Sequence, residues 1–144
     1  DMKNRSLHLL DSKNGQPLDI PLSKQAVAIL EAMPAGNEFV LSQVSRAGVI
    51  GPMTSFTKSA SQMRTKGVIW SNHDGRRGFI TAGGVLGANS YMVKQLVNHA
   101  DAGDVHASYQ TYTVAELRQT AQKICDHLEQ QLQTPFNPTN LATL

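Results

Sequence analysis

Eight polar side chains in this sequence have the chemistry that catalysis or ligand binding requires: Lys13, His73, Arg76, Arg77, His99, His106, Tyr109 and Tyr112. Imidazoles transfer protons or bind metals, guanidinium and ammonium groups bind anions, and a phenol oxygen becomes a nucleophile when a base or cations activate it. Each also fits an ordinary role at a turn, a helix end or the core. A Walker A loop, a dinucleotide fingerprint, an HExxH motif and paired cysteines are all absent from the sequence.

The segments before residue 45 predict a small antiparallel sheet. Apolar and polar residues alternate over residues 6–9 and 18–22, as in strands with one buried face. Asn14 and Gly15 lie between these segments and favour a hairpin turn, because both residues tolerate positive φ. Residues 39–41 predict a third strand. Lys13 is therefore expected at the tip of a hairpin.

The rest of the chain predicts helices. They are expected to begin after Ser23, at Gly51-Pro52, near His73, at Asn89-Ser90 and after Thr113. The last has the clearest signal, because Thr113 and Glu116 have the spacing of a capping box and apolar residues recur every three or four positions up to Leu132. The predicted fold is α+β and mostly helical, with a three-stranded antiparallel sheet near the N-terminus.

Four blocks of the sequence, taken in order, resemble the catalytic domain of the tyrosine recombinases, the phage-integrase family. In that family a hairpin that contains Lys-Asn-Gly leads to Pro-Leu-Ser. A His-Asp-Leu-Arg-Arg block follows, then Leu-Gly-His or Leu-Asn-His, and then a tyrosine. The matching residues here are Lys13-Asn14-Gly15 with Pro21-Leu22-Ser23, His73-Asp74-Gly75-Arg76-Arg77, Leu96-Val97-Asn98-His99, and Tyr109. The resemblance covers about residues 5–133.

The resemblance implies site-specific DNA cleavage and rejoining through a 3′-phosphotyrosyl intermediate. Tyr109 is the implied nucleophile, and Lys13 the implied proton donor to the departing 5′ oxygen. Arg76, His73 and His99 are implied to contact the phosphate oxygens, where negative charge grows in the transition state. His73 is also a candidate base for the tyrosine. No metal or other cofactor is implied, because the covalent link conserves the phosphodiester energy.

The resemblance also bears on domain organisation. The family's first catalytic arginine lies in a helix before the hairpin, and Arg5 is no substitute because it stands at the start of a strand. We therefore expect residues 1–134 to be a catalytic domain truncated before that helix and inactive alone. Residues 135–144, which contain two prolines, are expected to form a separable C-terminal tail.

Three further positions bear on how closely the sequence follows the family. Gly75 and Gly78 stand where the family usually has Leu and Thr, which loosens the helix that carries Arg76. Tyr112 is a second tyrosine near Tyr109. Tyr109 is preferred as the nucleophile because its distance along the chain from the preceding histidine matches the family. Arg77 is expected to make a surface phosphate contact or a salt bridge.

The composition is compatible with a cytoplasmic DNA-binding protein. The 144 residues are 40% hydrophobic and 17% charged, which is typical of one folded domain. Residues 1–80 carry ten Lys and Arg against six Asp and Glu, an excess that a DNA-binding face requires. The single Cys125 suits a reducing compartment, and no apolar run is as long as a membrane span. The expected partners are double-stranded DNA at attachment sites and, for a longer protein, further copies in a tetramer on that DNA, with no membrane.

Two other functions remain open at this point. One is a non-cutting DNA-binding module derived from an integrase, which the presence or absence of the upstream arginine would separate from the recombinase. The other is a metal-dependent hydrolase that uses His73, Asp74 and His99. Cleavage of DNA that is insensitive to chelators would exclude the hydrolase.

Overall fold

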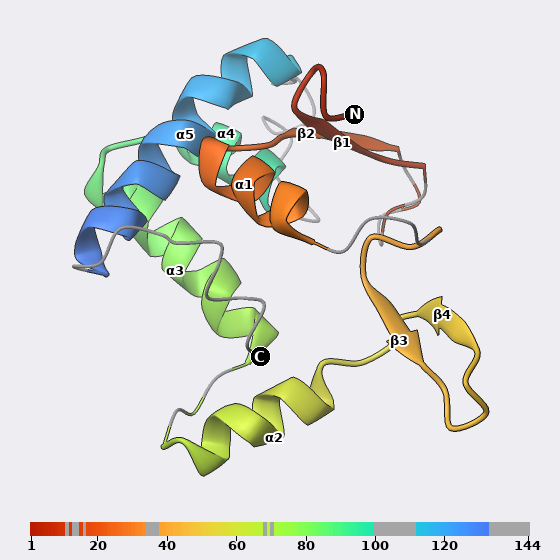
Figure 1. The fold of residues 1–144 in the computed structure, drawn as a ribbon. Coiled ribbons are helices and arrows are strands. Elements are labelled where there is room, and N and C mark those ends of the chain that lie inside the picture. The colour runs from red at the N-terminus through yellow and green to blue at the C-terminus, as the bar shows by residue number, and fades with distance from the viewer. Residues whose placement is uncertain are drawn as a thin grey trace.

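The structure is a computed structural model that describes residues 1–10, 12, 15, 17–33, 38–67, 69, 71–99 and 112–132. The strands in this part of the chain are β1 (Ser6–Leu9), β2 (Leu18–Pro21), β3 (Ser42–Val44) and β4 (Ile50–Pro52) (Figure 1). The helices are α1 (Lys24–Ala32), α2 (Thr57–Thr65), α3 (Asn72–Val85), α4 (Ser90–Leu96) and α5 (Val114–Gln131). The fold is of the mixed α+β class.

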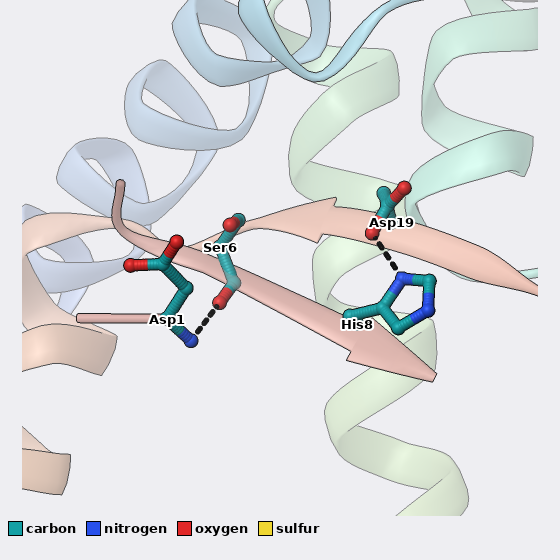
Figure 2. Close-up of polar contacts among 4 residues, drawn as sticks. All are labelled: Asp1, Ser6, His8 and Asp19. Carbon is teal, nitrogen blue, oxygen red and sulfur yellow. Dashed lines mark hydrogen bonds and ion pairs between the residues drawn. The ribbon is translucent and has the colours of Figure 1, made fainter. Parts of the chain in front are cut away.

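Strands β1 and β2 form the antiparallel hairpin that the sequence predicts. His8 lies opposite Asp19 in the register, and its Nδ1 is 2.6 Å from the Asp19 Oδ1 on an exposed face (Figure 2). The turn that leads into β1 is closed by a hydrogen bond from the Asp1 nitrogen to the Ser6 carbonyl oxygen at 2.9 Å (Figure 2). Ile20 packs against the core between α4 and α5. The hairpin thus joins the N-terminal segment to the helical body.

The prediction of one three-stranded sheet is wrong. Residues 39–41 are not a strand, and β3 pairs antiparallel with β4 in a second two-stranded sheet, separate from β1 and β2. The turn between them is closed by the Ser45 N–H, which donates to the Val49 carbonyl at 2.8 Å, and by Gly48 at a φ of 77°. Because the partner strand lies only a few residues downstream, this hairpin costs less chain entropy than pairing with the first sheet.

The prediction that Gly51 and Pro52 open a helix is also wrong. Both residues belong to β4, where Pro52 lies opposite Ser42 at the edge of the two-stranded sheet, a position at which its missing N–H is tolerated. Helix α2 begins five residues later, at Thr57, whose N–H donates to the Ser55 hydroxyl at 3.2 Å. In Figure 1 the β3–β4 hairpin and α2 lie to one side of the body that α3, α4 and α5 form.

The capping residues that the sequence predicts begin three of the helices. The Ser23 hydroxyl accepts an N–H of the first turn of α1 at 3.2 Å, and the Asn89 side chain accepts two at the start of α4. At α5 the Thr113 hydroxyl accepts the Glu116 N–H at 3.4 Å while the Glu116 carboxylate accepts the Thr113 N–H at 2.7 Å. These ends satisfy backbone groups that a helix leaves unpaired.

The core lies among α3, α4 and α5. Its buried apolar residues are Ala82, Val93, Leu96, Leu117, Ala121 and Ile124. Gly83 brings α3 close to α4, because a Cβ at this position would lie 2.9 Å from the Val93 Cγ2, whereas Gly84 next to it has open space. None of the helices in the described ranges is long and apolar enough to cross a bilayer.

Candidate functional site

Helix α3 carries two of the predicted site residues near its beginning. Ser71 precedes the helix, and both its backbone N–H and its hydroxyl donate to the Asp74 carboxylate, at 2.8 and 2.7 Å. These bonds hold the first turn together and lower the pKa of Asp74 below its ordinary value of 3.8. His73 in that turn is exposed, and Arg76 is half-buried. The capped turn therefore fixes where both side chains leave the backbone.

The positions of His73, Arg76, Ile80 and Gly84 form one stripe along α3. Steps of three and four residues bring helical positions to nearly the same direction, about 5–6 Å apart along the axis. The adjacent stripe carries Phe79, which packs against the core. Arg76 lies about 60° around the helix from Phe79 and is half-buried, whereas His73, Ile80 and Gly84 of the stripe are exposed.

His99 follows α4 in a turn that closes the helix. Asn98 has a φ of 50°, in the left-handed region, and its N–H donates to the Gln95 carbonyl at 3.0 Å. The His99 N–H donates to the Lys94 carbonyl at 2.9 Å. This pair of bonds is a Schellman motif in which asparagine occupies the position that glycine most often takes. The motif ends α4 and fixes the direction in which the chain carries His99.

A groove of about 280 Å³ lies between α3 and α4, and it brings His99 to the α3 stripe. Ile80 and Gly84 line it from α3, and Val93, Lys94 and Val97 line it from α4 and its end, together with His99. Arg76 lies one helical turn before Ile80, about 6 Å along the axis of α3. The groove therefore brings His99 next to Ile80, and Arg76 stands on the same stripe of α3, one turn beyond the residues that line the groove.

The groove combines an apolar floor with basic groups. The Lys94 ammonium lies 5.3 Å from the centroid of the Tyr91 ring and lines the same groove as His99. Guanidinium, ammonium and imidazole groups all donate hydrogen bonds to anions, and these bonds strengthen where water is partly excluded. The arrangement is thus suited to binding an anion such as a phosphate group.

Lys13, His106 and Tyr109 lie outside the described residues, as does the tail over residues 135–144. The roles that the resemblance implies for Lys13 and Tyr109 stay predictions.

Tyr112 is held in place by α4. Its N–H donates to the Gln95 side-chain oxygen at 3.0 Å, and its carbonyl accepts from the Gln95 amide at 2.8 Å. Its hydroxyl accepts from the Asn89 amide at 3.2 Å, at the beginning of α4, while His99 follows the end of that helix. A seven-residue helix is about 10 Å long. The Tyr112 hydroxyl therefore points to the opposite end of α4 from His99, and the side chain packs against the core.

The metal-dependent alternative finds no assembled ligand set in the described ranges. The Asp74 carboxylate accepts both hydrogen bonds from Ser71, and its pKa is lowered chiefly by them. No group of three His, Cys, Asp or Glu side chains that could hold a metal ion occurs among the described residues. Arg77 is exposed, and its charge contributes a smaller part of the lowered pKa of Asp74.

Sequence reasoning missed Lys94 and the apolar lining of the groove. Lys94 stands in the last turn of α4, five residues before His99, and that spacing alone does not show that both reach one groove. The pairing of α3 with α4, which creates the groove, depends on the close approach at Gly83.

The chain matches no family model, no curated protein and no solved structure.

Proposed function

We propose that this chain is the catalytic part of a tyrosine-type site-specific DNA recombinase, of phage or mobile-element origin. The observation that supports the proposal most is the groove between α3 and α4, which His99 lines together with Ile80. Arg76 stands one helical turn before Ile80 on the same stripe of α3. His99 comes 23 residues after Arg76 in the sequence, and the resemblance assigns His73, Arg76 and His99 to one phosphate. The Schellman turn at Asn98 provides the local reason why His99 reaches that groove.

The proposed reaction is a transfer of one phosphodiester bond. The Tyr109 oxygen attacks the phosphorus, a bond forms between them, and the bond from phosphorus to the 5′ oxygen breaks. Lys13 gives its proton to the departing 5′ oxygen, and His73 accepts the proton from the tyrosine. Arg76 and His99 stabilise the charge that grows on the other phosphate oxygens. The reverse attack by a 5′ hydroxyl of another strand completes the exchange.

The half-buried Arg76 is proposed to make the largest electrostatic contribution to phosphate binding. A guanidinium fork matches two phosphate oxygens and keeps its charge at all working pH values. Arg77, its exposed neighbour on the chain, points about 100° away around α3 and provides a matched control with the same side chain.

The proposal is tested by trapping a covalent adduct. Because the target sequence is unknown, the gene product that carries residues 1–144 is incubated with a pool of duplexes randomised around one 5′-bridging phosphorothiolate. The sulfur leaves as a thiolate, whose conjugate acid has a pKa of about 8.5, so the adduct forms without a proton donor and accumulates. We expect denaturant-resistant adducts, a rate about 10²–10³ lower for Arg76→Ala, and a near-normal rate for Arg77→Ala.

The same substrate separates the role of Lys13 from that of the other residues. Lys13→Ala is expected to lose cleavage of an ordinary phosphodiester and to keep cleavage of the phosphorothiolate, because only the ordinary oxygen leaving group needs a proton. Tight DNA binding without any adduct on either substrate would favour the non-cutting DNA-binding module. Adduct formation that requires a divalent cation would favour the metal-dependent hydrolase.

A further inference from the structure

A second basic site lies on the other side of α5 from the core. A hollow of about 320 Å³, called here the basic hollow, is lined by Arg5, Lys24, Arg118, Gln119, Gln122 and Lys123, with Leu22 between them. It shares no lining residue with the groove between α3 and α4. Four of its side chains are cationic and none is a carboxylate. The excess is notable in a chain whose net charge is only +2.

Three separate segments build the basic hollow. Arg118, Gln119, Gln122 and Lys123 form one stripe of α5, since they are spaced by one, three and one residues. Arg5 comes from the turn before β1, and Lys24 begins α1. Convergence of cations from distant segments places like charges together, which is unfavourable unless an anion lies among them.

Hydrogen bonds between these segments fix the walls. The Arg118 guanidinium donates to the carbonyl oxygens of Arg5 at 3.0 Å and Asn4 at 2.8 Å. The Leu22 N–H donates to the same Arg5 carbonyl at 2.8 Å. These bonds hold Arg5 at a φ of 47°, a left-handed conformation that non-glycine residues rarely adopt. The Arg5 backbone is thus fixed at the edge of the hollow by contacts from both other segments.

Hydrogen bonds from Gln122 of α5 hold the beginning of α1 against α5. Its side-chain oxygen accepts the Lys24 N–H at 2.9 Å, and its amide donates to Gln25 at 3.1 Å and to the Asp126 carboxylate at 2.7 Å. Asp126 also accepts from Gln25 at 2.9 Å, and these amides, with a smaller effect of the Lys24 charge, lower the pKa of Asp126. The Asp126 charge offsets part of the Lys24 charge from outside the hollow.

In the described part of the chain, the other three cations of the hollow form no ion pair with a carboxylate. The one ion pair within 4 Å there joins His8 and Asp19 on the β1–β2 hairpin, away from the hollow. The Asp1 carboxylate, which is close along the chain, accepts from the N–H and the side-chain amide of Asn4, at 2.9 and 2.6 Å. Among the described residues, no carboxylate within 4 Å therefore neutralises the charge of Arg5, Arg118 or Lys123, and the Arg118 guanidinium keeps its charge while it donates to the Asn4 and Arg5 carbonyls.

We propose that the basic hollow is a second anion site, and that it binds a phosphate group. Guanidinium groups bind phosphate oxygens in pairs, ammonium groups add mobile point charges, and the Gln119 amide adds a neutral donor. The volume accommodates one or two linked phosphates. The phosphate belongs either to a small polyphosphate or to a nucleic-acid backbone, and both present the same chemistry. The proposal does not rest on the recombinase assignment, because the two sites share no residue.

The test is a pair of titrations of the isotope-labelled protein followed by NMR, one with inorganic pyrophosphate and one with a short random duplex DNA. Binding is expected to shift the backbone amides of residues 4–6, 22–24 and 118–123. Lys123→Glu is expected to weaken binding about tenfold, since it replaces an attraction to the phosphate by a repulsion. Lys66→Glu, the same change at an exposed position on the end of α2, is expected to leave binding within about twofold.

The outcomes distinguish a small polyphosphate from a nucleic-acid backbone as the source of the phosphate. Shifts with pyrophosphate identify a small-anion site, and shifts with the duplex alone identify a contact to the polymer backbone. Both support the proposal. It is overturned if neither probe shifts these amides, or if Lys66→Glu weakens binding as much as Lys123→Glu. Lys123→Gln, which removes the charge without reversing it, is expected to weaken binding less than Lys123→Glu does, and unchanged amide shifts outside the basic hollow show that both variants are folded. Failure of adduct trapping at the other groove leaves this result unaffected.

Discussion

The His99 backbone N–H donates to the Lys94 carbonyl oxygen at 2.9 Å, and this bond links the two basic residues of the groove between α3 and α4. It forms only because Asn98, between them, turns the chain through the left-handed region at a φ of 50°. The position of His99 beside the α3 stripe is therefore set by one backbone conformation, which substitution at Asn98 can change.

Asn98→Ala is expected to destabilise the protein by about 1 kcal/mol, because the left-handed conformation has a higher free energy for alanine than for asparagine. Asn98→Gly, which adopts it freely, is expected to be neutral or slightly stabilising. Urea unfolding of both variants at neutral pH measures the difference. Equal stability of the two variants would mean that the turn at Asn98 is not formed in solution.

Gly83→Ala is expected to destabilise the protein by about 1–2 kcal/mol. The new Cβ would lie 2.9 Å from the Val93 Cγ2 and 3.3 Å from the Ile124 Cδ1, and both neighbours are buried, so the core must shift. Gly84→Ala meets no atom within 4 Å and is expected to stabilise α3 by about 0.5–1 kcal/mol. Thermal unfolding of the pair checks the prediction, and a gain from both substitutions would contradict the close packing of α3 on α4.

The capping boxes predict a loss of stability in acid. Hydrogen bonds from Ser71 lower the pKa of Asp74 below 3.8, and those from Thr113 lower the pKa of Glu116 below 4.5. Because the folded-state pKa values are the lower ones, the stability these carboxylates contribute is fully present above their unfolded-state values. It is lost as pH falls through the folded-state values.

Urea midpoints measured between pH 6 and pH 2.5 test this dependence, and they are expected to fall mainly below about pH 4.5. Glu116→Gln keeps the shape of the side chain without its charge, so the acid-induced fall is expected to shrink in this variant. An unchanged pH profile would show that the capping bond does not contribute.

Arg118→Ala is expected to lower stability by about 1–2 kcal/mol, since the guanidinium joins α5 to the Asn4 and Arg5 carbonyls. Arg118→Lys keeps the charge but has no planar fork to reach both oxygens, so it is expected to recover only part of the loss. Chemical unfolding measures both, and full recovery in the lysine variant would contradict the bridging geometry.

Much of the fold follows from local sequence signals. Ser23, Asn89 and Thr113 cap helices where their side chains predict it, and the alternation of residues 6–9 and 18–22 predicts the first hairpin. These signals act over a few residues, so neighbouring side chains and backbone groups decide the outcome. The second hairpin was missed because Pro52 has two compatible readings, the first turn of a helix and the edge of a sheet.

The groove and the basic hollow depend on contacts between distant segments. The block with His73 and Arg76 and the block with His99 are recognisable separately, but their meeting requires α3 to pack on α4 through Gly83. Arg5 and Arg118 are 113 residues apart, and neither carries a local signal that pairs them. Sequence patterns of helix and strand do not report such pairings, so neither the lining of the groove nor the basic hollow could be predicted from them.

The most direct measurement of the recombinase proposal identifies the residue that becomes linked to DNA. Adducts trapped on the phosphorothiolate pool are digested, and the peptide attached to the nucleotide is sequenced by mass spectrometry. We predict that it contains Tyr109, that Tyr109→Phe abolishes the adduct while DNA affinity stays within a few-fold, and that Tyr112→Phe retains it, because the phenylalanine keeps the ring and removes only the attacking oxygen. An adduct on Tyr112, or one that survives in Tyr109→Phe, would contradict the nucleophile. DNA binding by the intact protein with no adduct at any tyrosine would contradict the recombinase itself.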